Sequence, residues 1–365
     1  MGMDYNELLA RVRTIVNKYL EEVLNEVLDE AKNYGLEVTD LPFIAKDFTL
    51  RGGKRLRAYL VLLGYWCREW GLPVEHIKPL LASIEFLQSY LLVHDDIMDQ
   101  DTVRRGGPTV HVWFRDKCSE KNLLGDCIHY GVSQAIITGD YLESLAVNMF
   151  SRLNLPSNTL YKLLETYTKG LRTVSYGQYL DVLLSMKPLE QVREEDVLLV
   201  HKLKTSSYTV ELPLHLGAIA SNRYSNELLD ELSRYAIPAG IAFQMRDDIL
   251  GLYGDPSKTG KPVGSDVREK KKTLLIVKAY ELADHIDREF LNEIYDRKDP
   301  RDISEEDILR VQDIVKKTGS YDYVVEVMKR ETSKALEALR EAVLINRETK
   351  EALKWLLELF ISREK

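Results

Sequence analysis

One acidic segment has the residue types and the spacing of a divalent-metal site. Residues 95–101 read Asp-Asp-Ile-Met-Asp-Gln-Asp and end an apolar run that begins near Leu80. On a helix, Asp95 and Asp99 stand one turn apart on the same face, so their carboxylates repel each other unless a cation lies between them. Carboxylate oxygens suit a hard ion such as Mg²⁺. The alternative is a solvated helix terminus, although acids at that end oppose the helix dipole.

A second acidic pair, Asp247 and Asp248, lies about 150 residues downstream within another apolar helical run, residues 243–251. Two such helices can face each other across the cavity of a helical bundle and hold several Mg²⁺ ions, as polyphosphate chemistry requires. Either segment would be a weak signal alone. The pair together favours a substrate that carries a diphosphate.

Basic residues near the acids could bind the same kind of substrate. Residues 51–57 read Arg-Gly-Gly-Lys-Arg-Leu-Arg and place four cations around two glycines, where the backbone can approach a ligand. Arg104 and Arg105 follow the first acidic segment, and Lys261 and residues 270–272 follow the second. The alternative for any one of these bases is an ordinary surface ion pair, which contributes little energy.

Composition and missing motifs exclude several function classes. The chain has 365 residues, 45% of them apolar, and a net charge of −8, which argues against a surface that coats nucleic acid. It has no GxxxxGK[ST] loop and no GxGxxG after a strand, so nucleotide-binding folds are not supported. Its three cysteines, Cys67, Cys118 and Cys127, form no CxxC pair. This odd, sparse set predicts neither a disulfide framework nor a zinc site, and it favours a reducing, cytoplasmic compartment.

The elements that must position these residues are helices. Apolar residues recur every three or four positions, as at Leu9 and Val12, and no run shows strand-like alternation closed by a hairpin turn. The pattern predicts helices over residues 9–28, 59–70, 80–98, 122–150, 160–184, 194–219, 226–252, 273–295, 305–318 and 321–344. Pro213 and Pro238 should kink or break the helices that contain them. We therefore predict an all-α fold, a single domain over residues 1–365 and no membrane-spanning helix.

Several separated motifs carry a resemblance to a known family. They are residues 52–57, 95–111 (DDIMDQDTVRRGGPTVH), 139–140, 177–181 (GQYLD), 204–205, 243–273 and 318–320. On these motifs the chain resembles the trans-isoprenyl diphosphate synthases, and it is most similar to archaeal-type members that make geranylgeranyl diphosphate. The resemblance implies an isoprenoid synthase bundle around a deep apolar cavity, usually built as a homodimer, with the two acidic segments facing each other at the cavity mouth.

The resemblance also implies roles for particular residues. Three Mg²⁺ ions would bind the diphosphate of an allylic substrate (dimethylallyl, geranyl or farnesyl diphosphate), and their protein ligands would be Asp95, Asp99 and Asp247. The same diphosphate would contact Arg104, Lys204, Lys261 and Lys271. The second substrate, isopentenyl diphosphate, would be held by Gly53, Lys54, Arg57, Gln88 and Arg105.

The implied reaction is a head-to-tail condensation governed by charge. Metal ions and cationic side chains stabilise the negative charge on the departing diphosphate. The double bond of isopentenyl diphosphate attacks the allylic cation, and a proton is then lost to the released diphosphate rather than to a side chain. Lys204, Thr205 and Gln244 match positions near the reacting carbons, where water must be excluded.

Two further features bear on the ligand set and the product. The family's second acidic motif often ends in an acid, where this chain has Gly251, so one possible ligand is missing. Tyr90 stands five residues before Asp95, with Leu91 and Leu87 beside it on the helix that lines the cavity in the family. A single aromatic at this place resembles synthases that stop at C20. The alternative is that Tyr90 is a core aromatic with no effect on product length.

Other interpretations stay open. The main product could be farnesyl or farnesylgeranyl diphosphate instead. The chain could be a non-catalytic subunit of a two-subunit prenyl synthase, although Gly251 alone points that way. A metal phosphohydrolase built on the His94-Asp95 doublet would need further metal-binding histidines, and the later histidines show no matching pattern.

Overall fold

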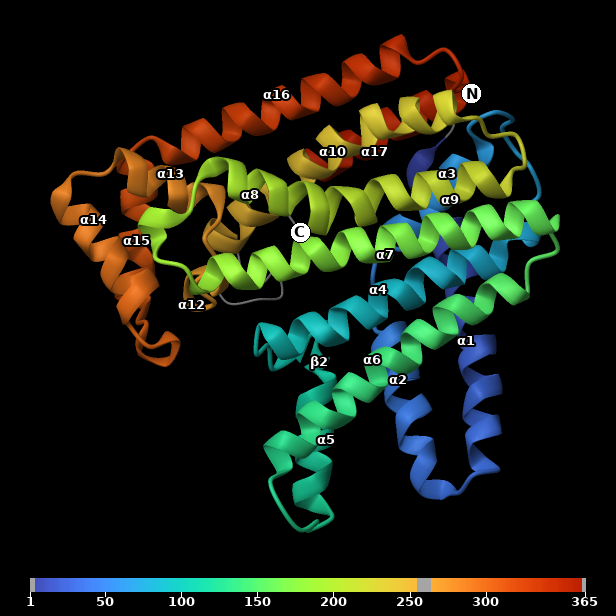
Figure 1. Ribbon diagram of the computed structural model, residues 1–365, viewed down its shortest axis with the longest axis horizontal. Helices are drawn as coiled ribbons and strands as arrows, with labels where there is room; N and C mark the ends of the chain where they lie inside the picture. The colour runs from blue at the N-terminus through green and yellow to red at the C-terminus, as the bar shows by residue number, and fades with distance from the viewer. Residues whose placement is uncertain (1–3, 255–263, 363–365) are drawn as a thin grey trace. The chain divides into compact units, whose positions relative to one another are not determined.

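The structure is a computed structural model, and it describes residues 4–254 and 264–362 (Figure 1). The chain divides into two compact units, and the boundary between them falls inside two helices. The first unit comprises Met1–Leu164 and Leu216–Arg223, and the second comprises Glu165–His215 and Tyr224–Lys365. Apart from the two short strands β1 and β2, every regular element of the described residues is a helix, which confirms the all-α prediction, while the single domain over residues 1–365 stays a prediction. None of the described helices is long and apolar enough to cross a membrane.

The first unit is built around one buried helix. Its elements are α1 (Tyr5–Lys32), η1 (Leu36–Thr39), α2 (Asp40–Leu50), α3 (Leu56–Trp66), η2 (Val74–Ile77), α4 (Lys78–Met98), β1 (Val103–Arg104), β2 (Gly107–Pro108), α5 (Val110–Glu120), α6 (Cys127–Ser151) and the start of α7 (Ser157–Met186). Every residue of α4 from Pro79 to Ser89 is buried, and α6 runs alongside it (Figure 1). Because this part of α4 is enclosed on all sides, the last turns of the same helix are held rigidly where they emerge.

The second unit packs around α10. Its elements are the rest of α7, η3 (Leu189–Gln191), α8 (Glu194–Val200), the π-helix η4 (His201–Glu211), the start of α9 (Leu212–Ala220), α10 (Asn226–Tyr253), α12 (Ser265–Arg268), α13 (Leu274–Leu282), α14 (His285–Asn292), the π-helix η5 (Glu293–Arg297), η6 (Pro300–Asp302), α15 (Glu305–Lys317), α16 (Ser320–Glu341) and α17 (Arg347–Ile361). Met245, Ile249 and Leu252 of α10 belong to its main apolar cluster, together with residues of α13, α15 and α16. Helix α10 is therefore packed against several other helices of this unit.

The sequence pattern located most of the long helices and missed several shorter elements. It gave no sign of α2, α5 or α17, nor of the two-residue strands β1 and β2. The prediction that Pro238 interrupts its helix is not met by a break, because α10 runs through it from Asn226 to Tyr253. Pro213 is the second residue of α9, directly after the 11-residue π-helix, so its missing N–H falls where the helical ladder changes type.

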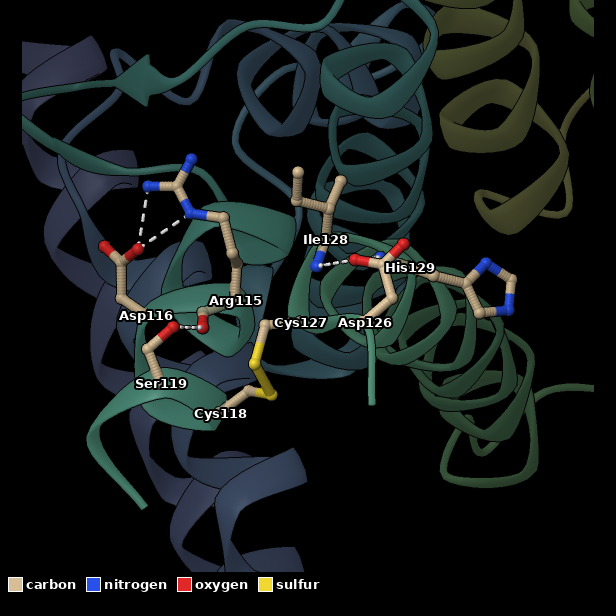
Figure 2. Close-up of a disulfide and its surroundings, with 8 residues drawn as sticks. All are labelled: Arg115, Asp116, Cys118, Ser119, Asp126, Cys127, Ile128 and His129. Carbon is tan, nitrogen blue, oxygen red and sulfur yellow. Dashed lines mark hydrogen bonds and ion pairs between the residues drawn. A yellow bond between two sulfur atoms is a disulfide. The ribbon is translucent and has the colours of Figure 1, made fainter. Parts of the chain in front are cut away.

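The prediction that the cysteines form no disulfide is wrong. Figure 2 shows Cys118, near the end of α5, bonded to Cys127, the first residue of α6, with their Cα atoms 5.5 Å apart. The connection between the two helices reverses the chain, and the Asp126 side chain starts α6 by accepting hydrogen bonds from the backbone N–H groups of Ile128 and His129. A search for short CxxC spacings cannot find a pair that a tertiary turn brings together. The reducing, cytoplasmic compartment inferred from the same count stays a prediction.

Candidate active site

The first acidic segment ends α4 and separates its two adjacent acids. Asp95 is half-buried, whereas Asp96 is fully buried and pairs with the guanidinium of Arg104 on β1. Burial raises the pKa of Asp96 to about 7, against the lowering effect of Arg104. Asp99 is the C-cap residue of α4 and is half-buried as well. The two acids that spacing predicts as metal ligands thus stay near the surface of this unit, and the hard oxygen chemistry of their carboxylates fits Mg²⁺.

The predicted allylic diphosphate contact Arg104 is engaged by carboxylates of its own unit. Besides Asp96, it contacts Asp101, whose Oδ2 lies 3.1 Å from Nη2. These bonds fix the short β1–β2 hairpin, whose register pairs Val103 with Pro108, against the end of α4.

The predicted isopentenyl diphosphate residues all lie in the first unit, and two of them are in contact. Gly53 has a φ of 100°, and a Cβ there would lie 3.3 Å from the Arg105 guanidinium, so glycine permits both the turn and the close approach. Burial, and then the neighbouring cations Arg55, Arg104 and Arg57 against the opposing effect of Glu85, lower the pKa of Arg105. Cations held this close together provide a place where an anion is favoured.

Within the same basic segment the cations divide into two groups. Arg55 is buried and forms an ion pair with Glu85 at 3.0 Å, and Arg51 donates to Asp47 and to the carbonyl of Pro108, so both hold the fold. Lys54 is exposed and Arg57 is half-buried. Gln88 on α4 is 8% exposed, and its Oε1 accepts no hydrogen bond from the described residues.

The predicted length-determining residues lie one and two turns before the first acidic segment. Leu87 is buried, and Tyr90 and Leu91 are half-buried. The Tyr90 ring meets the His94 ring edge-on at 4.8 Å between centroids, and burial, followed by the Glu143 and Asp140 carboxylates of α6, raises the pKa of Tyr90.

His94 itself packs into α6. Its Nε2 lies 3.2 Å from the carbonyl oxygen of Ile136, and it occupies the space that a side chain at Gly139 would need. The Gly139 position of the family motif therefore accommodates this ring. That packing gives His94 a structural role, which accounts for the residue without the phosphohydrolase interpretation.

In the second unit, a π-helix presents Lys204 and Thr205. Two glycines let neighbouring helices touch its backbone, because a Cβ at Gly177 of α7 would clash with Lys204 and one at Gly240 of α10 would clash with Ser206. Wide π-turns are frequent at functional sites, and here the widened turns bring the Lys204 amine to Asp181 of α7 at 2.6 Å.

A pocket opens beside this π-helix, entirely within the second unit. Its lining residues come from α7, α8, η4, α10 and the segment before α13: Asp181, Leu184, Ser185, Val197, Val200, His201, Lys204, Thr205, Gln244, Asp248, Lys271, Lys272 and Thr273. At its wall the Thr205 hydroxyl donates to Gln244 Oε1 at 2.7 Å, and Gln244 Nε2 donates to Asp248 Oδ1 at 2.8 Å. Lys204, Thr205 and Gln244, predicted to lie near the reacting carbons, do line one pocket.

The second acidic segment also separates its adjacent acids. Asp247 is half-buried, and Asp248 is 6% exposed and faces the pocket. At Gly251, a side chain would run into the carboxylate of Asp266 on α12. The place where the family often has another acid is therefore taken by an acid from a different element.

The basic residues after the second segment have different fates. Lys271 forms an ion pair with Glu269 at 2.6 Å. Lys272 is buried and donates to the carbonyls of Leu184 and Ser185 at the end of α7, and burial lowers its pKa. Lys261 lies outside the described residues.

Four residues around this site were missed as site residues: Asp181, His201, Asp248 and Asp266. Asp181 had a signal, since it closes the GQYLD motif at residues 177–181. Asp248 had one as well, since it is half of the second acidic pair, but its spacing did not show that it faces the pocket. His201 and Asp266 had no signal, because their positions depend on tertiary packing. Among the described residues, no group of three or more His, Cys, Asp or Glu side chains is close enough to hold a metal ion.

Comparisons with solved structures agree with this fold. The crystal structure of a geranylgeranyl pyrophosphate synthase from Corynebacterium glutamicum, complexed with isoprenyl diphosphate and magnesium, superposes with a TM-score of 0.88 at 33% identity, covering 99% of this chain and 100% of that one. The geranylgeranyl pyrophosphate synthetase of Pyrococcus horikoshii gives a TM-score of 0.80 at 32% identity, covering 98% and 99% of the two chains. The class of fold is that of the isoprenoid synthases.

Sequence comparisons are more specific. The polyprenyl synthetase family model matches residues 41–315. The geranylgeranyl diphosphate synthase of Saccharolobus solfataricus is 33% identical over 353 residues, covering 95% of this chain and 98% of that protein. The geranylfarnesyl diphosphate synthase of Aeropyrum pernix is 35% identical over 318 residues, covering 86% and 91%. The chain belongs to the polyprenyl synthetase family.

Proposed function

We propose that this protein is a prenyltransferase that condenses isopentenyl diphosphate head-to-tail with allylic diphosphates, with geranylgeranyl diphosphate as its main product. The family and the relatives named above support the reaction class. The structural observation that carries it is the pocket of the second unit, where a lysine, a threonine hydroxyl and a glutamine amide lie together on the wall that also bears the acidic segment.

The acids are assigned to metal binding. Asp95, Asp99 and Asp247 would hold Mg²⁺, with three ions in each active site, and the bound metal would neutralise charge on the allylic diphosphate. The cations Arg104, Lys204, Lys261 and Lys271 would complete that anion site. Asp181 would orient the Lys204 amine through the 2.6 Å ion pair.

The second substrate is assigned to the first unit. Gly53, Lys54, Arg57, Gln88 and Arg105 would bind isopentenyl diphosphate. The lowered pKa of Arg105 reflects burial and its crowding by other guanidinium groups, a cost that a bound diphosphate would offset. The buried Oε1 of Gln88 has no hydrogen-bond partner among the described residues, and a polar group of the bound substrate site would supply one.

The chemistry then needs little from side chains beyond position and charge. Lys204, Thr205 and Gln244 would hold polar atoms near the reacting carbons, and the apolar wall of Leu184, Val197 and Val200 excludes water that would quench an allylic cation. No general base is required, because the released diphosphate takes the proton. Tyr90 on α4 would limit the product to C20, with Leu91 and Leu87 beside it.

We also propose a homodimer. On α6, Ile136, Ile137 and Val147 are exposed, and on α7 the second unit exposes another apolar row, formed by Tyr176, Tyr179, Val182, Leu183 and Met186. Exposed apolar rows of this length on long helices are typical of association surfaces. Light scattering coupled to gel filtration measures the state directly, and a monomer at micromolar concentration would contradict the proposal.

The test of the function is elongation. Purified protein is incubated with Mg²⁺, isopentenyl diphosphate and farnesyl diphosphate, and the alcohols released by phosphatase are sized. Geranylgeraniol that is lost on chelation and in Asp95→Ala supports the proposal. Farnesylgeraniol or longer alcohols would keep the reaction class and overturn the C20 assignment. Absence of elongation from every allylic starter would favour the non-catalytic subunit instead.

A further inference from the structure

His201 contacts the pocket wall at a point that the proposed roles leave unexplained. It is the first residue of the π-helix and is 5% exposed. Its ring Nε2 lies 3.1 Å from Oδ2 of Asp248, and both side chains line the pocket of the second unit. The ring Nδ1 makes no hydrogen bond within the described residues. Burying an imidazole and a carboxylate costs free energy unless the two groups are paired with each other or with other polar groups. The contact between His201 and Asp248 is such a pairing.

Asp248 connects His201 to the polar groups of the pocket. Its Oδ1 accepts from Gln244 Nε2 at 2.8 Å, and Gln244 Oε1 accepts from the Thr205 hydroxyl at 2.7 Å. The Gln244 amide therefore has one orientation, because the flipped amide would set its oxygen against the carboxylate. The Thr205 hydroxyl is directed in turn by the amide oxygen.

The two oxygens of Asp248 differ in how they are held. Gln244 secures Oδ1, while Oδ2 has no hydrogen-bond partner among the described residues and makes only an ion-pair contact, at 3.1 Å, with Nε2 of His201. Without that ring the carboxylate would be free to rotate about its side-chain torsions, and a rotation would release the Gln244 amide. The nearby Lys204 is engaged by Asp181, and Lys272 by backbone carbonyls, so neither duplicates the position of His201.

We propose that His201 is a positioning residue: it fixes Asp248 as the anchor of Gln244 and Thr205, so that Asp248 orients the pocket and Asp247 alone of this pair serves the metal. The inference rests on the proposed function for the meaning of Thr205 and Gln244. It predicts that the loss of His201 disturbs the reacting groups and leaves the binding of diphosphate intact.

Three substitutions separate the position of a nitrogen from the volume of the ring. His201→Gln carries an amide nitrogen to about the reach of Nε2, His201→Asn carries one only to the reach of Nδ1, and His201→Leu fills similar volume with no donor. We expect kcat to fall about 10–100-fold in the Leu and Asn variants and to return within about threefold of wild type in the Gln variant. KM for both substrates should change less than about threefold in all of them.

A second readout does not depend on turnover. Calorimetry with Mg²⁺ and inorganic pyrophosphate should give the same affinity for wild type and His201→Leu, and melting temperatures report folding. If the Leu variant does not fold, Asp248→Asn takes its place and should also lower kcat while keeping pyrophosphate affinity.

The outcomes are distinct. A Leu variant with full kcat, Leu and Gln variants that fall alike, or a loss of pyrophosphate affinity in either His201→Leu or Asp248→Asn would each overturn the positioning role. A wild-type protein that elongates no allylic diphosphate overturns the proposed function, and this inference with it.

Discussion

The two acidic segments each bury one of their two adjacent aspartates, and different residues hold the buried carboxylate in each segment. Each contains adjacent aspartates, and in each the first is half-buried while the second is buried, 0% exposed for Asp96 and 6% for Asp248. Neighbouring residues on a helix point about 100° apart, so an adjacent pair cannot present both carboxylates to one ligand. In the first segment Arg104, a permanent cation, holds the buried acid; in the second, a histidine and an amide hold it.

The difference shows what each buried acid organises. Asp96 ties the β1–β2 hairpin to the end of α4, which is an architectural task. Asp248 ties two pocket side chains together, which is a task at the site. The segments differ also at the fifth position, where the first has Asp99 and the second has Gly251 with the Asp266 carboxylate packed against it. The two acidic segments are therefore similar in sequence but differ in what surrounds their buried acids and their fifth positions.

The largest expected effect comes from the half-buried acids. Asp95→Asn and Asp247→Asn should each lower kcat about 10²–10³-fold, because each removes a carboxylate proposed to hold the Mg²⁺ that would neutralise the departing diphosphate. Isopentenyl diphosphate incorporation measures the loss, and melting temperatures near that of wild type would show that the fold survives. Equal rates in Asp247→Asn and wild type would contradict the proposal that Asp247 binds the metal while Asp248 orients the pocket side chains.

The buried acid of the first segment should show itself in stability rather than in rate. The folded pKa of Asp96 is about 7, above its ordinary value of 3.8, so the folded state holds an extra proton between these values. Its contribution to stability is full below pH 4 and is lost as the pH rises through 7, by about 4 kcal/mol at most. Urea unfolding of wild type and Asp96→Asn from pH 4.5 to 7.5 tests this. The unfolding free energy of wild type should fall relative to that of Asp96→Asn as the pH rises from 4.5 to 7.5, because the asparagine does not titrate, and a difference that stays constant with pH would contradict it.

The fifth position of the second segment gives a smaller effect. Gly251→Ala should lower the unfolding free energy by about 1–2 kcal/mol, because the new methyl group meets the Asp266 carboxylate. The double variant Gly251→Ala with Asp266→Ala should recover most of that loss, as coupled neighbours do. Additive losses in the double variant would show that the two positions do not share this space.

The smallest effect on rate is expected at Tyr90, upstream of the first acidic segment, where a substitution should change the length of the product. Tyr90→Ala should lengthen the product beyond C20 at a rate within about tenfold of wild type, because a half-buried ring is removed from α4. Leu92→Ala is the matched control, since it lies on the opposite side of the same helix. An unchanged product in Tyr90→Ala would leave the ring as a core aromatic.

How much of this could be predicted is clearest at the acids. Helical period and spacing predicted α4 and α10 and the acidic segments they carry, because those signals lie within a few residues of one another, while the metal-binding role of Asp95, Asp99 and Asp247 stays a prediction. Which aspartate of each doublet turns inward could not be predicted, since the two are chemically identical and the choice depends on Arg104 and His201 in other elements. The role of Asp266 could not be predicted either, because its contact with the Gly251 position depends on how α12 packs against α10. The pairing of Cys118 with Cys127 depends on a turn that no short motif encodes.

That disulfide has a practical consequence for thiol chemistry. Of three cysteines, two are joined, and Cys67 is 0% exposed. A maleimide or Ellman's reagent should therefore find no reactive sulfur in the native oxidised protein, one after denaturation and three after denaturation with reduction. Counting alkylated cysteines in protein taken directly from cells would read the oxidation state that the chain had there. The fraction of molecules with the Cys118–Cys127 bond formed would thus report how oxidising the surroundings of the protein were in the cell.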